Sequence, residues 1–183
     1  MGRMYDEVGT EIEEVPYKIE KGPNKGHRIM VTGSAKHSTD RNNFGSSCIE
    51  IPSGDDHYLT IDGDFNTTGP FTIEWWQSST YGTHSALWDF RKTDGTTNNN
   101  LFFDHAKSGN TNEIAYVIGS SPETVFQTPT GAVTDGAWHH VVLQRDATKF
   151  KVFWDGLELA HTSGPAVTDH VTDAIAASGS PLL

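Results

Sequence analysis

The segment from Trp138 to His161, WHHVVLQRDATKFKVFWDGLELAH, decides the fold class of this chain of 183 residues. Within it, Asp155-Gly156 is a two-residue signal for a type I′ turn, because both turn positions need a positive φ. The turn sets the register of a β-hairpin in which Trp154 lies opposite Leu157. Since side chains alternate between the two faces of a strand, this register also fixes which residues point together.

A second turn, at residues 146–149, predicts a preceding hairpin in which Arg145 lies opposite Phe150. The two turns are independent, yet both place the same apolar side chains on one face of an antiparallel sheet. That predicted core face consists of Val141, Leu143, Phe150, Val152, Trp154, Leu157 and Leu159. The opposite face is mixed and carries His140, Val142, Phe153 and Glu158.

Further short segments precede this meander, each bounded by Gly, Pro, Asn, Asp or Ser. In one of them Phe71, Ile73 and Trp75 alternate onto one face, and Trp76 points the other way. None shows the period of about 3.6 residues that marks a helix. Many short strands without helices between them predict an all-β sandwich or barrel. The expected strands are 28–32, 47–51, 58–61, 71–77, 86–91, 101–104, 113–118, 124–128, 138–145, 150–154 and 157–161.

The composition disfavours some classes of partner. The formal net charge is -11, with 35% hydrophobic and 20% charged residues. Nucleic acids and anionic membranes would be repelled by this charge. Cys48 is the single cysteine, so we expect no disulfide within the chain. We interpret its thiol as a small core side chain.

Residues 1–26 differ from the rest, because charged side chains dominate and Pro16 and Gly22-Pro23 interrupt them. We interpret this segment as an arm. It is either loosely ordered in solvent or an attachment segment that becomes ordered on a partner. The sequence shows no apolar run typical of a secretory signal, so we expect synthesis in the cytoplasm without signal-dependent export.

Several blocks resemble the laminin-G-like domains in their order and spacing. Residues 44–49, 58–61 and 71–76 are similar to the opening strands of that family, and residues 138–146 and 152–156 to its later hairpin. The resemblance implies a concanavalin A-like antiparallel jelly-roll β-sandwich that binds glycans or proteins. Such domains recur in extracellular receptors, in secreted glycanases and in phage fibre and virion proteins.

We assign this β-sandwich to residues 27–183. At its C-terminal end the chain departs from the resembled family, whose domains continue into further strands. The sequence therefore predicts an incomplete sandwich, either a fragment of a longer protein or a domain that neighbouring chains complete. An unfinished sheet would leave an exposed edge.

The candidate ligand site combines aromatic and polar side chains near the loop that follows the strand at 71–77. Aromatic rings beside Asn and Asp side chains suit the stacking of a sugar. The alternative is that both tryptophans of this set fill the core. The candidate residues are Trp76, Tyr81, Trp88 and Asp89.

Asp62, Asp64 and Asn66 place three oxygen ligands at alternate positions, a pattern that suits calcium. The alternative is a polar turn, because the glycine and the bidentate glutamate of an EF-hand loop are missing. No other cofactor is expected. His139 and His140 are adjacent on a strand and point to opposite faces, so the two rings cannot bind one metal ion.

We expect no catalytic residues and no enzymatic activity, because the paired-carboxylate strand pattern of glycanases with this fold does not occur. The leading hypothesis is a virion structural protein, such as a phage fibre, spike or capsid-surface component, with a lectin-like head. Its expected partners are other virion proteins, a surface glycan and further copies of itself in a homo-oligomer such as a trimer. The alternative is a carbohydrate-binding module from a secreted bacterial protein, and the third hypothesis is a glycanase.

Overall fold

The computed structural model describes residues 28–54, 57–61, 69–82, 85–89, 101–105, 112–118 and 123–169, together with three short strands nearer the N-terminus. All elements in these ranges are strands and turns, as expected for an all-β fold. No helix among them is long and apolar enough to cross a membrane. The chain divides into two compact units, residues 1–63 and 64–181. The expected boundary between residues 26 and 27 stays a prediction.

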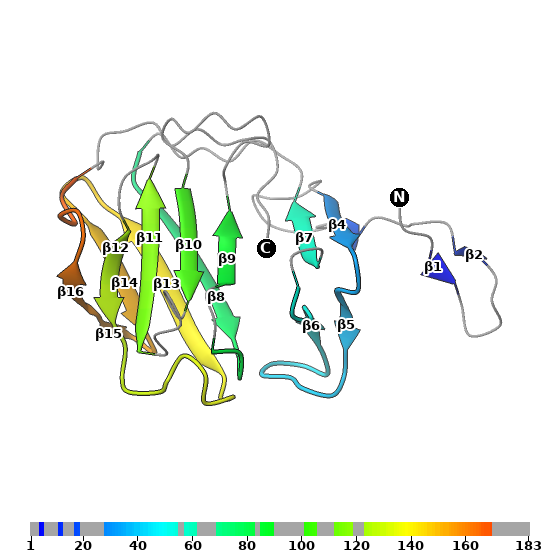
Figure 1. Cartoon of the computed structure of the whole chain (residues 1–183). Coiled ribbons are helices and arrows are strands. Elements are labelled where there is room, and N and C mark those ends of the chain that lie inside the picture. The colour runs from blue at the N-terminus through cyan, green and yellow to red at the C-terminus, as the bar shows by residue number, and fades with distance from the viewer. Residues whose placement is uncertain are drawn as a thin grey trace. The chain divides into compact units, whose positions relative to one another are not determined.

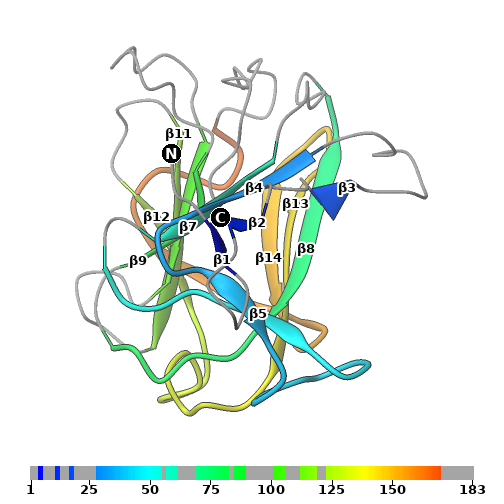
Figure 2. The same cartoon turned by 90° about the vertical axis from the view of Figure 1, so that its right-hand side faces the viewer.

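The unit formed by residues 64–181 is a sandwich of two antiparallel sheets (Figures 1 and 2). One sheet has the order β16-β12-β11-β10-β9 and comprises Ser85–Asp89 (β9), Leu101–His105 (β10), Glu113–Ile118 (β11), Thr124–Gln127 (β12) and Ala160–Ser163 (β16). The other has the order β15-β14-β13-β8 and comprises Phe71–Gln77 (β8), His139–Arg145 (β13), Phe150–Trp154 (β14) and Leu157–Glu158 (β15).

The core of the sandwich lies between the inner faces of these two sheets. Alternate residues of each strand point inward, as the period of two requires. Trp75 of β8 meets Phe103 of β10 edge to face, with the ring centroids 5.1 Å apart. The fully or almost fully buried cluster comprises Phe103, Ile114, Tyr116, Ile118, Phe126, Ala132, Val133, Val141, Leu143, Phe150, Val152, Trp154 and Leu159.

Both predicted hairpin registers are confirmed, with Trp154 opposite Leu157 and Arg145 opposite Phe150. The turn residues Asp155 and Gly156 have φ values of 49° and 81°, as a type I′ turn requires. The other loop is held by Asp146, whose Oδ1 accepts hydrogen bonds from the backbone nitrogens of Thr148 and Lys149 at 2.7 and 2.9 Å. The loop hydrogen bonds, led by that from the Thr148 hydroxyl, lower the pKa of Asp146.

Leu157 was expected in the core and is instead 64% exposed. The register is correct, but β15 is an edge strand of only two residues, so Leu157 lies at the rim of the sheet. The expected strand at 157–161 also divides. After Leu159, which is buried as expected, the chain crosses to the other sheet and continues as β16 beside β12.

Arg145 is an unexpected member of the core face, only 1% exposed at the end of β13. Its Nε and Nη2 donate hydrogen bonds to the Gly69 carbonyl oxygen at 3.0 and 2.7 Å. Its guanidinium lies 4.8 Å from the ring centroid of Phe71. A hydrogen-bonded guanidinium over an aromatic face is a way to bury this charge, and it fixes the segment that leads into β8.

In residues 1–63, Tyr17–Lys18 (β3), Arg28–Thr32 (β4) and Tyr58–Ile61 (β7) form a three-stranded sheet. Two further pairs are formed by Lys36–Ser38 (β5) with Cys48–Glu50 (β6), and by Met4–Tyr5 (β1) with Glu11–Ile12 (β2). The arm therefore adds β3 to β4 of its own chain. Cys48 is half-buried rather than in the core, because among the described strands β6 pairs with the short β5 alone.

Candidate functional site

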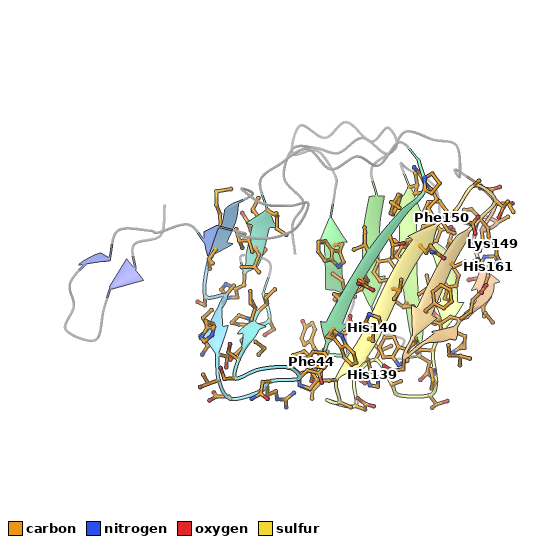
Figure 3. The ribbon with its side chains drawn as sticks, turned by 180° about the vertical axis from the view of Figure 1, so that it is seen from behind. Phe44, His139, His140, Lys149, Phe150 and His161 are labelled. Carbon is orange, nitrogen blue, oxygen red and sulfur yellow. The ribbon has the colours of Figure 1, made fainter. Side chains whose placement is uncertain are left out.

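The exposed Trp76 and the half-buried His140 form an aromatic pair on the outer face of the β8–β13 sheet. They are cross-strand partners, their ring centroids are 5.0 Å apart, and their planes differ by 24°, so the rings stack. Trp76 is 42% exposed. Figure 3 shows that His140 lies at the same end of β13 as His139, far along the strand direction from Phe150. We call the Trp76–His140 pair the aromatic platform.

Polar and apolar groups continue this outer face beyond the platform. Glu74 precedes Trp76 by two residues on β8, and its carboxylate lies 3.6 Å from Nε2 of His140. Val142 lies opposite Glu74 on one side and opposite Phe153 on the other. Val142 and Phe153 are half-buried, which confirms the mixed outer face expected from the sequence. An aromatic surface beside a hydrogen-bonding carboxylate can stack a sugar ring and hold its hydroxyl groups.

His139, directed to the opposite side of β13 from His140, lies between two carboxylates. Its Nδ1 is 2.7 Å from Oδ2 of Asp155, and its Nε2 is 3.1 Å from Oδ1 of Asp135. Its ring packs on Trp154 with a centroid separation of 4.6 Å. The other Asp155 oxygen accepts the backbone N–H of His140 at 2.9 Å. These contacts fix the start of β13 and, with it, the platform histidine.

Burial lowers the pKa of His139, but the hydrogen bonds to Asp155 and Asp135 raise it more, so its pKa lies above the ordinary value. A backbone hydrogen bond from Ala137 is the main reason why the pKa of Asp135 is lowered. The two carboxylates therefore stabilise the charged form of the imidazole relative to a free histidine. Since both ring nitrogens are engaged, His139 has a structural role rather than that of a metal ligand.

Tyr81 lies on the loop that follows β8 and is 47% exposed. Two hydrogen bonds attach this loop to the segment before β13. The Ser78 hydroxyl donates to the Gly136 carbonyl oxygen at 2.8 Å, and the Gly136 nitrogen donates to the Ser79 carbonyl oxygen at 3.0 Å. Tyr81 is therefore an exposed aromatic side chain on an anchored loop, next in the chain to the strand that carries Trp76.

The structure does not place all four predicted ligand residues on one surface. Trp88 of β9 is half-buried and packs against the inward-facing Trp75, with the centroids 5.9 Å apart. Trp88 thus contributes to the core side of the sandwich, and we leave it out of the platform. Asp89 is the last residue of β9 and pairs with Phe102, but its side chain lies outside the described part of the structure.

The calcium hypothesis concerns Asp62, Asp64 and Asn66, which lie outside the described residues and remain a prediction. Within the described ranges, no group of three or more His, Cys, Asp or Glu side chains is arranged to hold a metal ion.

Sequence reasoning identified Trp76 but missed its partner His140 as part of the site. Half of the signal was available, because the predicted alternation puts His140 on the outer face. The pairing of β8 with β13, which places the two rings side by side, is seen in the folded chain alone. The roles of Asp135 and Asp155 could not have been read from the sequence, because these residues belong to turns that approach His139 only in the folded chain.

The family model for the concanavalin A-like lectin/glucanases superfamily, of laminin G type, matches residues 52–180. The chain belongs to this superfamily. Its domain is a lectin-like jelly roll, as the resemblance in the sequence implied. A search of curated proteins gives no match for this chain.

Solved structures resemble this concanavalin A-like domain at low sequence identity. The binding domain of botulinum neurotoxin serotype G is 13% identical with a TM-score of 0.59, over 98% of this chain and 41% of that one. Mouse laminin α1 domains LG4-5 are 12% identical with a TM-score of 0.49, over 69% and 31% of the two chains. The CBM40 of the Ruminococcus gnavus IT-sialidase, bound to α2,3 sialyllactose, is 17% identical with a TM-score of 0.46, over 63% of each chain. The chain thus spans less than two thirds of each structure, and the first of these likenesses supports the fold alone.

Proposed function

We propose that this concanavalin A-like domain is a non-catalytic glycan-binding head and that the protein is a structural component of a phage or viral particle. The observation that carries the binding role is the exposed platform of Trp76 stacked on His140. An indole that remains 42% exposed on an ordered sheet offers an apolar ring face to the C–H groups of a sugar. The neighbouring Glu74 supplies a hydrogen-bond acceptor for its hydroxyl groups.

The same surface supports binding rather than hydrolysis. Cleavage of a glycosidic bond commonly needs two carboxyl groups, roughly 5–10 Å apart, on either side of the scissile bond. The strand β8 carries one carboxylate, Glu74. Asp135 and Asp155 are engaged with His139 in a structural cluster. Release of reducing sugar from a glycan by the pure protein would overturn the non-catalytic assignment.

Trp76→Ala should weaken glycan binding about tenfold or more, because an exposed aromatic anchor supplies a large share of the energy of such a contact. The melting midpoint should change little, since Trp76 lies on the outer face. A glycan array would identify a ligand, and calorimetry would then compare its affinity for the unchanged protein and for Trp76→Ala. Thr72→Ala is the matched control, because Thr72 is exposed on the same face at the other end of β8. Equal binding by Trp76→Ala and the unchanged protein would remove the platform from the site.

The virion role rests on the sequence and on the fold class together. Lectin-like domains act outside cells, where disulfides are common, yet this chain has the single cysteine Cys48. Assembly of a particle in a reducing cytoplasm, followed by release on lysis, accounts for this combination. The charged arm at residues 1–26 offers a segment for attachment to other particle proteins. Its β1–β2 pair is separate from the sheet of β3, β4 and β7.

Deletion of residues 1–16 should abolish incorporation into particles while leaving the rest of the chain folded. The deletion spares the pairing of β3 with β4 and removes no strand of the sandwich. Deletion of residues 1–26 should also remove β3 and serves as the more severe comparison. Incorporation is measured by quantifying the protein in purified particles, and folding by thermal melting. Particles that contain normal amounts of either shortened protein would contradict the anchoring role.

The second candidate is a carbohydrate-binding module from a secreted bacterial protein, which the aromatic platform favours equally. The two functions differ in their dependence on assembly. Specific glycan binding by the isolated chain, with no particle protein that recruits it, would favour the module.

A further inference from the structure

We infer that the aromatic platform binds uncharged saccharides in preference to sialylated and sulfated ones. This inference rests on the proposed glycan-binding function and adds the chemical class of the ligand. It comes from the charged side chains near Trp76 and His140 on this sheet.

Glu74 is the charge nearest the platform along β8. Its side chain is 67% exposed, two positions from Trp76 on the same outer face. Its carboxylate is 3.6 Å from the ring of His140, the other half of the platform. A sugar stacked on Trp76 therefore lies within reach of a solvent-facing carboxylate. Sugar hydroxyl groups can donate charge-assisted hydrogen bonds to it, whereas a ligand carboxylate or sulfate would meet a like charge.

The cationic side chains of this sheet are directed elsewhere or already paired with carboxylates. Lys149 lies 3.1 Å from Glu158, and Lys151 lies 3.3 Å from Asp146. Arg145 is buried in the core and donates to a backbone carbonyl oxygen. Within this sheet, an anionic ligand at the platform would thus have to displace an existing ion pair to gain a lysine partner.

The end of β13 beside the platform adds further negative charge. His139 carries at most one positive charge and lies between two carboxylates, those of Asp135 and Asp155. Both carboxylates are partly exposed, with 44% and 46% of their side-chain surface accessible. This cluster therefore keeps a net negative charge even when the imidazole is protonated. The formal net charge of -11 for the whole chain has the same sign.

The test measures binding to two matched sets of saccharides. The neutral probes are cellohexaose, maltohexaose, chitohexaose and N-acetyllactosamine. The anionic probes are sulfated forms of cellohexaose, maltohexaose and chitohexaose, together with sialylated and sulfated N-acetyllactosamine. We expect a neutral probe to bind and to lose affinity in Trp76→Ala. Its anionic counterparts should bind about two- to fivefold more weakly, as repulsion between exposed charges predicts.

A second variant, Glu74→Gln, tests the cause of the discrimination. The amide keeps the size and a carbonyl acceptor but removes the charge. The difference in affinity between neutral and anionic probes, which we call the gap, should therefore become smaller. Higher salt should narrow the gap in the unchanged protein as well, since it screens exposed charges. Thr72→Ala should leave the gap as it is.

The outcomes separate this inference from the function on which it rests. Trp76-dependent binding of an anionic probe, as tight as that of its neutral counterpart or tighter, overturns the inference and leaves glycan binding standing. A gap that Glu74→Gln does not change also overturns the assigned role of Glu74. Binding of no saccharide in either set, by a folded protein, overturns both the inference and the proposed function.

Discussion

Trp154→Ala is expected to lower the free energy of unfolding by about 3–5 kcal/mol, the usual effect of truncating a buried tryptophan. Trp154 is 3% exposed in the core cluster, and its ring packs on that of His139 at 4.6 Å. Its loss would leave a cavity and also release His139 from the position between its two carboxylates. Since single domains have a total stability of about 5–15 kcal/mol, the variant should be largely unfolded or melt far below the original.

The matched control for this substitution is Leu157→Ala. Leu157 is the direct cross-strand partner of Trp154, but it is 64% exposed at the edge of the sheet. Its truncation should change the free energy of unfolding by no more than about 0.5 kcal/mol. Chemical denaturation of both variants gives the comparison. A soluble Trp154→Ala protein with an unchanged midpoint would show that β14 does not present Trp154 to the core.

The comparison of Trp154 and Leu157 also shows what the sequence could predict about the fold. Local turn chemistry fixed the register of β13, β14 and β15, because a type I′ turn and a short loop leave little freedom. Burial is a property of the whole sandwich, and register alone does not determine it. Alternation placed Leu157 on the core face, but the strand ends before the opposite sheet can cover it.

The candidate site was predictable in part for the same reason. Trp75 and Trp76 are adjacent, so alternation alone separates an inward ring from an outward one. Trp88 stands in no such pair, and only its contact with Trp75 shows that it faces the core side. Nor could the sequence show that β13 is the neighbour of β8, a pairing across more than sixty positions that creates the platform. Composition and residue spacing do not determine which strands pair when they lie far apart in the sequence.

Gly164→Ala is the second substitution expected to lower the stability strongly. Gly164 follows β16, the strand that the chain forms after it crosses from β15 to the other sheet. Gly164 has a φ of 89° at the end of β16. An added Cβ would overlap the Glu123 carbonyl oxygen and lie 2.8 Å from the Glu123 carbonyl carbon, both backbone atoms that cannot rotate away. The left-handed conformation costs a non-glycine residue about 1–2 kcal/mol, and forced overpacking typically adds about 1–3 kcal/mol.

The clash should also be transmitted to the segment that follows. Val167 packs against the core, and its carbonyl oxygen accepts the backbone N–H of Phe150 at 2.7 Å. Pro165 likewise accepts a hydrogen bond from the Thr124 hydroxyl at 3.3 Å. A shift of residue 164 away from Glu123 would strain both contacts, so the free energy of unfolding should fall by about 2–5 kcal/mol.

Gly156→Ala separates the steric part of this effect from the backbone part. Gly156 has a similar φ of 81°, but an added Cβ there meets no atom within 4 Å. It should therefore cost only the backbone term of about 1–2 kcal/mol. Equilibrium denaturation of the two variants measures the difference, which we expect to exceed about 1 kcal/mol because a Cβ at residue 164 has no space. If Gly164→Ala were no less stable than Gly156→Ala, the close approach of β16 to the start of β12 would be wrong, and with it the path that brings Val167 to the core.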